Sequence, residues 1–154
     1  MNKDKKIVIF DLDGTLADIS ARRALSIIDG KMDWDRFFNP ENIKLDEPNI
    51  PVIKAARVFA QTGHRVIILS GRSKATKDIT RKWLADNNVP FDILKMRPTN
   101  HPWKFMPDDK LKQHWLDTLL NKDDIICVFD DRQKVVNMWR ENGVACFQDA
   151  PGDF

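Results

Sequence analysis

Short apolar runs at three places along this chain end directly in polar and charged groups. The runs cover residues 7–10, 66–69 and 125–129. Their length and their content of β-branched residues are typical of strands buried on both faces of a sheet. The carboxyl ends of parallel strands meet at one edge of an open α/β sheet, so the groups that follow are expected at a common site. These groups are Asp11-Leu12-Asp13-Gly14-Thr15, Ser70-Gly71-Arg72 and Asp130-Asp131-Arg132.

Strand-like and helix-like patterns alternate along the rest of the chain, which predicts a parallel sheet covered on both faces. Strands are expected at 6–10, 65–69, 91–95, 124–129 and 144–147. Helices are expected at 52–62 and 74–87, from a cap near Asp108 through Leu119, and from Val135 to a stop at Gly143. We therefore predict one α/β domain over residues 1–154, a Rossmann-like three-layer sandwich with a mainly parallel sheet.

Two segments interrupt this alternation. Residues 18–49 are too long for a simple connection and contain several aromatic residues, so they are expected to form a small helical cap insert over the site. Residues 97–107 form a loop with three prolines and the aromatic residues Trp103 and Phe105. Loops of this kind above the edge of a sheet often determine specificity.

Composition limits the class of protein without identifying one. The 154 residues are 42% hydrophobic and 31% charged, which is typical of globular domains, and the net charge of +2 does not by itself indicate a nucleic-acid partner. No apolar run is long enough to cross a membrane, and the charged residues 1–6 lead into a strand without a signal-length apolar stretch. We therefore predict a cytoplasmic protein without a membrane partner. Cys127 and Cys146 are expected as buried thiols and not as a disulfide.

The segment that begins at Asp11 has the composition of a catalytic loop. If the strand continues, Asp11 and Asp13 point the same way, and Gly14 allows a sharp turn. One carboxylate can attack phosphorus while the other gives a proton to the leaving oxygen. A calcium-binding EF-hand loop also begins with this spacing, but it needs glycine at position six and a carboxylate at position twelve. Here glycine is fourth and Arg22 is twelfth, which excludes that interpretation. A solvated turn explains the glycine but not two aligned acids.

The other two polar segments complement these acids. The hydroxyl group and backbone N–H groups around Ser70 can bind phosphate oxygens, and Arg72 can add bidentate contacts, although an ordinary strand-to-helix turn is typical of the segment taken alone. Adjacent Asp130 and Asp131 repel each other unless a cation is near. With Asp11 they would form an oxygen-rich site that suits Mg²⁺. A helix N-cap would explain one of these acids but not both.

Lys112 is a candidate cation because it lies between the second and the last of these segments. Taken alone it would be a surface lysine on a helix, and Lys104 and Lys110 remain alternative candidates.

The three histidines show no metal-ligand spacing. Trp103 either packs the loop or offers a stacking surface for a base, and packing is the simpler interpretation.

Together these segments resemble the haloacid dehalogenase-type phosphatase superfamily, and within it the 3′-phosphatase domain of phage-type polynucleotide kinase/phosphatases. The resemblance extends over most of the chain, and residues 135–140 and Gly152-Asp153-Phe154 indicate the narrower group. It implies that Asp11 is the nucleophile and that Asp13 is the general acid and then the base. The implied Mg²⁺ site consists of Asp11, Asp13, Asp130 and Asp131. The implied phosphate and substrate contacts are Thr15, Arg22, Ser70, Gly71, Arg72, Arg97 and Lys112.

The chain also departs from this group. Bifunctional members carry a kinase domain first, whereas this chain starts at the phosphatase strand and contains no Gly-x-x-x-x-Gly-Lys-Ser/Thr motif, so no kinase activity is expected. The segment 18–49 looks longer than in the family, and the insert after Ser70-Gly71-Arg72 looks shorter. Both are expected to border the pocket of the leaving group.

The sequence thus predicts a Mg²⁺-dependent phosphomonoesterase that acts on a nucleic-acid 3′-phosphate or a nucleotide. One alternative keeps the chemistry but takes a nucleoside monophosphate or another small ester, which a cap that closes the site would favour. A second alternative is a non-enzyme, either a phospho-acceptor of the receiver type or a phosphate-binding module. In receivers the phosphorylated aspartate lies mid-chain on a different strand from the acid pair. Here Asp11 follows the first strand, and Asp13 can act as a proton relay.

Overall fold

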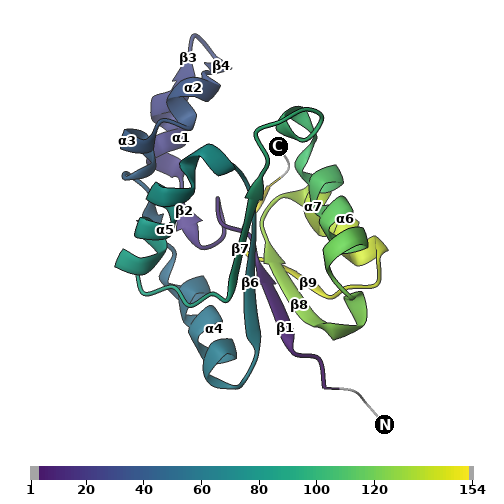
Figure 1. Cartoon of the computed structure of the whole chain (residues 1–154). Helices are drawn as coiled ribbons and strands as arrows, with labels where there is room; N and C mark the ends of the chain where they lie inside the picture. Colours follow the sequence, from purple (N-terminus) through teal and green to yellow (C-terminus); the bar gives the residue numbers. More distant parts are fainter. Residues whose placement is uncertain (1–3, 153–154) are drawn as a thin grey trace.

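Five parallel strands form one sheet at the centre of the computed structural model, which describes residues 4–152. Their order in the sheet is β7-β6-β1-β8-β9 (Figure 1). The chain adds strands outward from β1 in both directions, so the carboxyl end of β1 is a topological switch point, where ligands of open α/β sheets bind. The strands are β1 (Ile7–Phe10), β6 (Arg65–Ser73), β7 (Ile93–Arg97), β8 (Ile125–Asp130) and β9 (Cys146–Gln148).

Helices cover both faces of this sheet (Figure 1). One face carries α4 (Ile50–Gln61) and α5 (Lys77–Asp86), and the other carries α6 (Asp108–Leu119) and α7 (Gln133–Glu141). Layers of helix, parallel sheet and helix confirm the predicted α/β Rossmann-like sandwich. Short 3-10 helices lie in the connections: η1 (Lys74–Thr76), η2 (Trp103–Phe105) and η3 (Lys122–Asp124).

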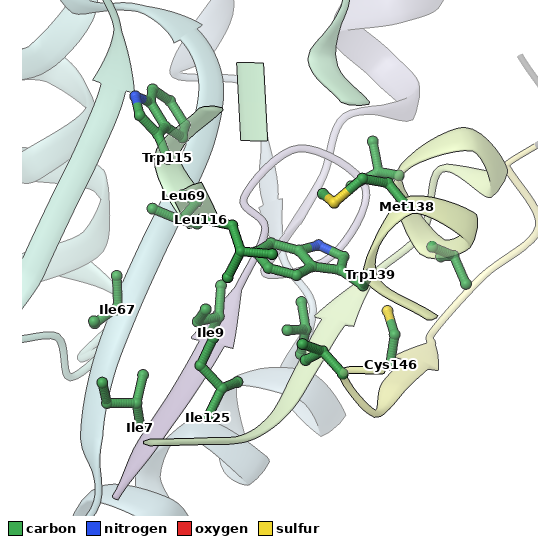
Figure 2. Packing of buried hydrophobic residues seen from close by; sticks show 14 of the residues in the cluster. Ile7, Ile9, Ile67, Leu69, Trp115, Leu116, Ile125, Met138, Trp139 and Cys146 are labelled. Carbon is green, nitrogen blue, oxygen red and sulfur yellow. The ribbon is translucent and has the colours of Figure 1, made fainter. Parts of the chain in front are cut away.

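Alternating residues of the strands divide the core into two clusters, one on each face. In β1, Ile7 and Ile9 belong to the cluster with α6 and α7, whereas Val8 and Phe10 belong to the cluster with α4 and α5. Because both faces are covered, every position of the strand needs an apolar residue, which explains the continuous apolar runs in the sequence. Trp139 of α7 is fully buried in the first cluster, and Figure 2 shows its indole ring lying between α7 and the sheet.

The segment between β1 and α4 forms a cap at the carboxyl end of the sheet (Figure 1). It contains the expected short helices, and also two pairs of antiparallel strands that the sequence did not predict. Asp33 and Asn39 begin two of the helices, because their side chains accept backbone N–H groups of Arg36 and Glu41. The elements are β2 (Ala17–Asp18), α1 (Ser20–Ser26), β3 (Ile27–Ile28), β4 (Lys31–Met32), α2 (Trp34–Phe37), α3 (Pro40–Ile43) and β5 (Glu47–Pro48).

One boundary differs from the prediction in a way that bears on the site. β6 does not end at Leu69 but continues to Ser73, and its pairing with β7 is irregular between Ser70 and Ser73. Ser70-Gly71-Arg72 is therefore part of an irregular strand end and not of a strand-to-helix turn. The Ser73 side chain accepts the N–H of Ala75 and caps η1, which precedes α5. The strands predicted at 91–95 and 144–147 begin later, at Ile93 and Cys146.

Several smaller expectations are also tested by the structure. Gly143 follows α7 with a φ of 76°, as a helix stop requires. Cys127 and Cys146 are buried free thiols, as predicted. Within residues 4–152, no helix combines the length and the apolar character needed to cross a membrane. Residues 1–3, at the charged start, and Asp153-Phe154, which contribute to the family resemblance, lie outside the described residues.

Candidate active site

Three carboxylates meet where β1 and β8 end. Asp11 follows β1 directly, Asp130 is the last residue of β8, and Asp131 comes next in the chain. The parallel pairing of Phe10 with Phe129 brings Asp11 and Asp130 to the same level of the sheet. Each of the three residues offers a carboxylate oxygen, and these oxygens lie within 4.8 Å of one another. The predicted juxtaposition of these two segments is thus present in the structure.

Gly14 is needed for this arrangement. Its φ is +82°, in the left-handed region that glycine adopts readily. A Cβ atom at Gly14 would lie 2.1 Å from a carboxylate oxygen of Asp131. A residue with a side chain would therefore both strain this turn and push Asp131 out of the cluster.

Lys112 of α6 is the cation that faces the acids. Its Nζ donates to Asp11 Oδ1 at 2.9 Å and to Asp130 Oδ2 at 2.8 Å, and the residue is only 2% exposed. Burial lowers the pKa of Lys112, but the carboxylates of Asp11 and Asp130 outweigh this effect and raise it above the usual value. The rivals Lys104 and Lys110 are both exposed to solvent.

The acids carry more negative charge than Lys112 can balance. Burial raises the pKa of Asp11 well above its usual value, and Asp130 adds to this effect. Burial and Asp130 raise the pKa of Asp131 to about 6. Clustered carboxylate oxygens are the ligands that Mg²⁺ prefers, and a divalent cation among them would remove this repulsion. The donor set therefore fits the metal that the resemblance implies.

Asp13 lies apart from this cluster, between two arginines. Its Oδ1 accepts from Arg22 Nη2 at 2.8 Å and from Arg72 Nε at 2.8 Å. Burial alone would raise the pKa of Asp13, but Arg72 and Arg22 together lower it. The two guanidinium groups thus favour the ionised form of Asp13, and 22% of its side chain is exposed. Asp13 was included in the predicted metal site, yet its carboxylate is not a member of the three-acid cluster.

Asp46 completes this network, and the sequence analysis had missed it. Its carboxylate accepts from Arg22 Nε at 2.9 Å and from Arg72 Nη2 at 2.7 Å, with the side chains of all three residues fully buried. Burial raises the pKa of Asp46 to about 6 despite these arginines, so it is ionised at neutral pH. The Asp46 carbonyl also accepts from Trp83 Nε1 at 2.9 Å. Asp46 belongs to the cap and Arg72 to β6, so this network ties the cap to the sheet.

Arg97 lies in a different place from the other two predicted arginines. Its guanidinium donates to the carbonyls of Gly71 and Trp103, at 2.9 and 2.7 Å, and pairs with Asp108. Asp108 also pairs with Arg132 at 3.0 Å. These contacts fix the loop after β7 against the end of β6. Sequence analysis placed Asp108 only near the cap of a helix, and α6 does begin at this residue. Its pairing with Arg97 and Arg132 is a tertiary contact that no sequence pattern reports.

Of the remaining predicted residues, Ser70 and Thr15 are buried and Gly71 is half-buried. Ser70 is 1% exposed, and its Oγ accepts the N–H of Arg72 at 3.1 Å. Gly71 is required where it stands, since a Cβ atom there would lie 2.6 Å from Asp108 Oδ1. Thr15 is fully buried and donates through Oγ1 to Asp149 Oδ1 at 2.8 Å. This hydrogen bond links the segment after β1 to Asp149, an acid that the sequence analysis did not select.

A cleft of about 180 Å³ opens over these groups, between the sheet and the cap. Its lower wall includes Asp11, Asp13 and Asp131, and its upper wall comes from apolar cap residues that include Phe37 and Phe38. The arrangement offers a carboxylate beside a metal-binding set, a second carboxylate held by guanidinium groups, and a buried ammonium group. Such a set can bind a phosphate ester and transfer its phosphoryl group.

Comparison with known proteins also indicates a phosphatase. A family model of the polynucleotide kinase PNKP phosphatase domain matches residues 5–154. A protein of the Autographa californica nuclear polyhedrosis virus, named as a bifunctional polynucleotide kinase/RNA ligase, is 31% identical over 146 residues. That match covers 91% of this chain but only 18% of the viral protein.

Solved structures agree in fold. A chain of the Pnkp1/Rnl/Hen1 complex superposes with a TM-score of 0.79 at 32% identity, covering 100% of this chain and 49% of that one. The present chain thus spans about half of that relative. A Clostridium difficile protein described as a phosphatase has a TM-score of 0.65 at 15% identity, over 95% of this chain and 85% of its own, which shows the shared fold. With its three-acid cluster at the end of β1 and β8, this chain belongs to the PNKP phosphatase-domain family of haloacid dehalogenase-type phosphatases.

Proposed function

We propose that this phosphatase is Mg²⁺-dependent and removes 3′-phosphates from RNA ends through a phosphoryl group transferred to Asp11. The observation that supports this most is the position of the Asp11 carboxylate. It borders the cleft, beside Asp130 and Asp131 and hydrogen-bonded to Lys112. The RNA assignment is supported by a relative, at 34% identity over 97% of this chain, from a Pnkp1/Rnl/Hen1 RNA repair complex.

The reaction has two steps. In the first, an Asp11 oxygen bonds to phosphorus and the bond from phosphorus to the 3′ oxygen breaks. Asp13, which takes up a proton as the negatively charged phosphate binds beside it, gives that proton to the 3′ oxygen. In the second, Asp13 takes a proton from water, whose oxygen then displaces Asp11 and releases inorganic phosphate. Arg22 and Arg72 stabilise the ionised form of Asp13 between the two steps.

Asp11, Asp130 and Asp131 would hold the Mg²⁺ ion through their carboxylates. The ion would neutralise charge that otherwise repels the approach of Asp11 to a phosphate. Lys112 orients the Asp11 oxygen by a hydrogen bond and contributes a second positive charge at the same place. The buried free thiols of Cys127 and Cys146 suit a reducing compartment, and we place the protein in the cytoplasm.

A panel of phosphate esters tests this proposal. We expect phosphate release from a 3′-phosphorylated oligoribonucleotide with Mg²⁺ and none with EDTA. A matched oligonucleotide with a 5′-phosphate should not be a substrate, because its phosphate is joined to the 5′ oxygen of the oligonucleotide and not to the 3′ oxygen that we propose as the leaving group. Faster turnover of small esters would favour the small-ester alternative, and faster turnover of the matched DNA would contradict the RNA assignment. Absence of release from every ester would support a non-enzymatic phosphate-binding module.

Mg²⁺ should stabilise the fold, and this stabilisation should shrink in acid. The raised pKa values of Asp11 and Asp131 mean that, without metal, these two carboxylates bind more protons in the folded protein than in the unfolded chain between about pH 4 and pH 6. Their contribution to stability therefore increases as the pH falls through this window. Mg²⁺ needs the ionised acids and competes with these protons. At a concentration of about 100 Kd we expect about 2.7 kcal/mol of stabilisation near neutral pH and much less at about pH 5.

Thermal unfolding with and without Mg²⁺ at the two pH values measures this difference. Ca²⁺ at the same ionic strength separates selective binding from a general effect of divalent salt. An equal shift of the melting temperature by Mg²⁺ at both pH values would contradict the assignment of the metal to these carboxylates.

A further inference from the structure

A second and larger cavity adjoins the catalytic cleft. Its volume is about 900 Å³, and it lies between the cap helices α2 and α3 on one side and residues 97–106 on the other. Trp34, Phe38 and Gly71 line both the cavity and the cleft, so the two are continuous. Figure 1 shows the cap and the loop between β7 and α6 at the same end of the molecule. We call this cavity the cap groove.

Aromatic rings are exposed on both sides of the cap groove. Trp34 of the cap is 61% exposed, and Phe105 of the opposite loop is 77% exposed. The rings of Trp34 and Phe38 are nearly parallel, with an interplanar angle of 19° and centroids 6.0 Å apart. Large aromatic side chains are normally buried, so their exposure around one groove indicates a binding surface. Trp103 is different, because it packs against the core and against His114.

Positive charge accompanies these rings. Lys104 and Arg97 line the groove, although Arg97 is already paired with Asp108, and Asp35 is the one acid among the described residues that line it. Lys104 is exposed, with its Nζ 5.4 Å from the centre of the Phe105 ring, and no ion pair of Lys104 is found within residues 4–152. Aromatic rings beside an unpaired lysine are the combination that proteins use for single-stranded nucleic acids, in which bases stack on rings and phosphates lie near cations.

We propose that the cap groove binds the nucleotides that precede the terminal 3′-phosphate of a single-stranded RNA. The inference rests on the proposed function. With the 3′-phosphate at Asp11, the leaving ribose points out of the cleft past Trp34 and Phe38 and into the groove. Its bases stack on the exposed rings of Trp34 and Phe105, while Lys104 lies near a backbone phosphate. A duplex end is disfavoured, because its bases already stack on each other and cannot present their faces to these rings.

The test compares two substrates that share the same chemistry. For the wild type and each variant, kcat/KM is measured on a 3′-phosphorylated oligouridylate of about ten nucleotides and on uridine 3′-monophosphate. Phe105→Ala should lower the kcat/KM for the oligouridylate relative to that for uridine 3′-monophosphate by about 10- to 100-fold, since each base–ring stack contributes that much. Phe147→Ala is the matched control and should keep the ratio of the two kcat/KM values, because Phe147 is an exposed phenylalanine on β9 that does not line the groove.

Lys104→Ala gives an independent readout. For the oligouridylate, the slope of log kcat/KM against the logarithm of salt concentration should become shallower by the amount expected for the loss of about one phosphate contact. The slope for the mononucleotide should stay as it is. A 3′-phosphorylated blunt duplex should be a poorer substrate than the single strand for the wild type.

The outcomes separate this inference from the proposed function. If the wild type releases phosphate from neither uridylate, the proposed function is wrong. If it acts on both and Phe105→Ala keeps their ratio, the phosphatase assignment stands and the groove does not bind RNA. A blunt duplex as good as the single strand would also overturn the stacking of bases in the groove.

Discussion

Asp11→Asn should lower kcat for phosphate release by at least about 10³-fold while the protein remains folded. The amide cannot bond to phosphorus as the carboxylate does, so the first step is lost. Folding should tolerate the change, because the raised pKa of Asp11 shows that its ionised form is costly in this buried position. The neutral amide of similar shape also reduces repulsion with Asp130 and Asp131. Steady-state turnover together with thermal unfolding measures both effects.

Asp123→Asn is the control for this change of charge. Asp123 is exposed in η3, at the opposite end of β8 from the acids, and its replacement should leave kcat within about twofold. Turnover by Asp11→Asn at a rate near that of the control would show that another group attacks phosphorus. A large loss of stability would instead show that Asp11 is mainly a structural partner of Lys112.

Asp46→Ala should destabilise the protein by about 3–5 kcal/mol. The change leaves Arg22 and Arg72, both fully buried, with only Asp13 to balance two positive charges. A buried charge that loses its partner carries a large desolvation cost, unlike an exposed one. Because these residues join the cap to β6, activity should fall as well. Urea unfolding measures the free energy, and proteolysis under native conditions reports whether residues 18–49 become accessible.

Asp86→Ala is the matched control for this second prediction. Asp86 also pairs with a cation, Lys82, but both side chains are more than half exposed, so its loss should cost less than about 1 kcal/mol. Asp46→Asn keeps the shape and one acceptor oxygen, and it should lose less stability than Asp46→Ala. Equal losses for Asp46→Ala and Asp86→Ala would mean that the buried network does not hold the cap.

The acid cluster could be predicted from sequence because simple rules place its members. Apolar runs without polar interruption indicate strands buried on both faces, and such strands end together at one edge of the sheet. This rule predicted that Asp11 and Asp130 lie close together although more than a hundred residues separate them in the sequence. It also made Lys112 a candidate, although only the helix α6 and its packing decide between Lys112 and its neighbours.

The network around Asp13 could not be predicted in the same way. Asp46 reaches Arg22 and Arg72 only through the path of the cap, and no periodic pattern reports that path. Asp108 and Asp149 are likewise distinguished only by contacts with distant residues. The irregular end of β6 was missed for a related reason. Its residues 70–73 are polar or small, and sequence patterns there favour a turn, whereas pairing with β7 extends the strand.

Trapping the phosphoryl-enzyme tests the central claim most directly. Asp13→Asn removes the base of the second step, and an aryl phosphate with a good leaving group needs little help from an acid in the first. After this variant is mixed with the aryl phosphate and Mg²⁺ and quenched in acid, mass spectrometry of its peptides should find one phosphoryl group on Asp11. A phosphoryl group on any other residue would contradict the account, as would rapid turnover of the variant with none bound.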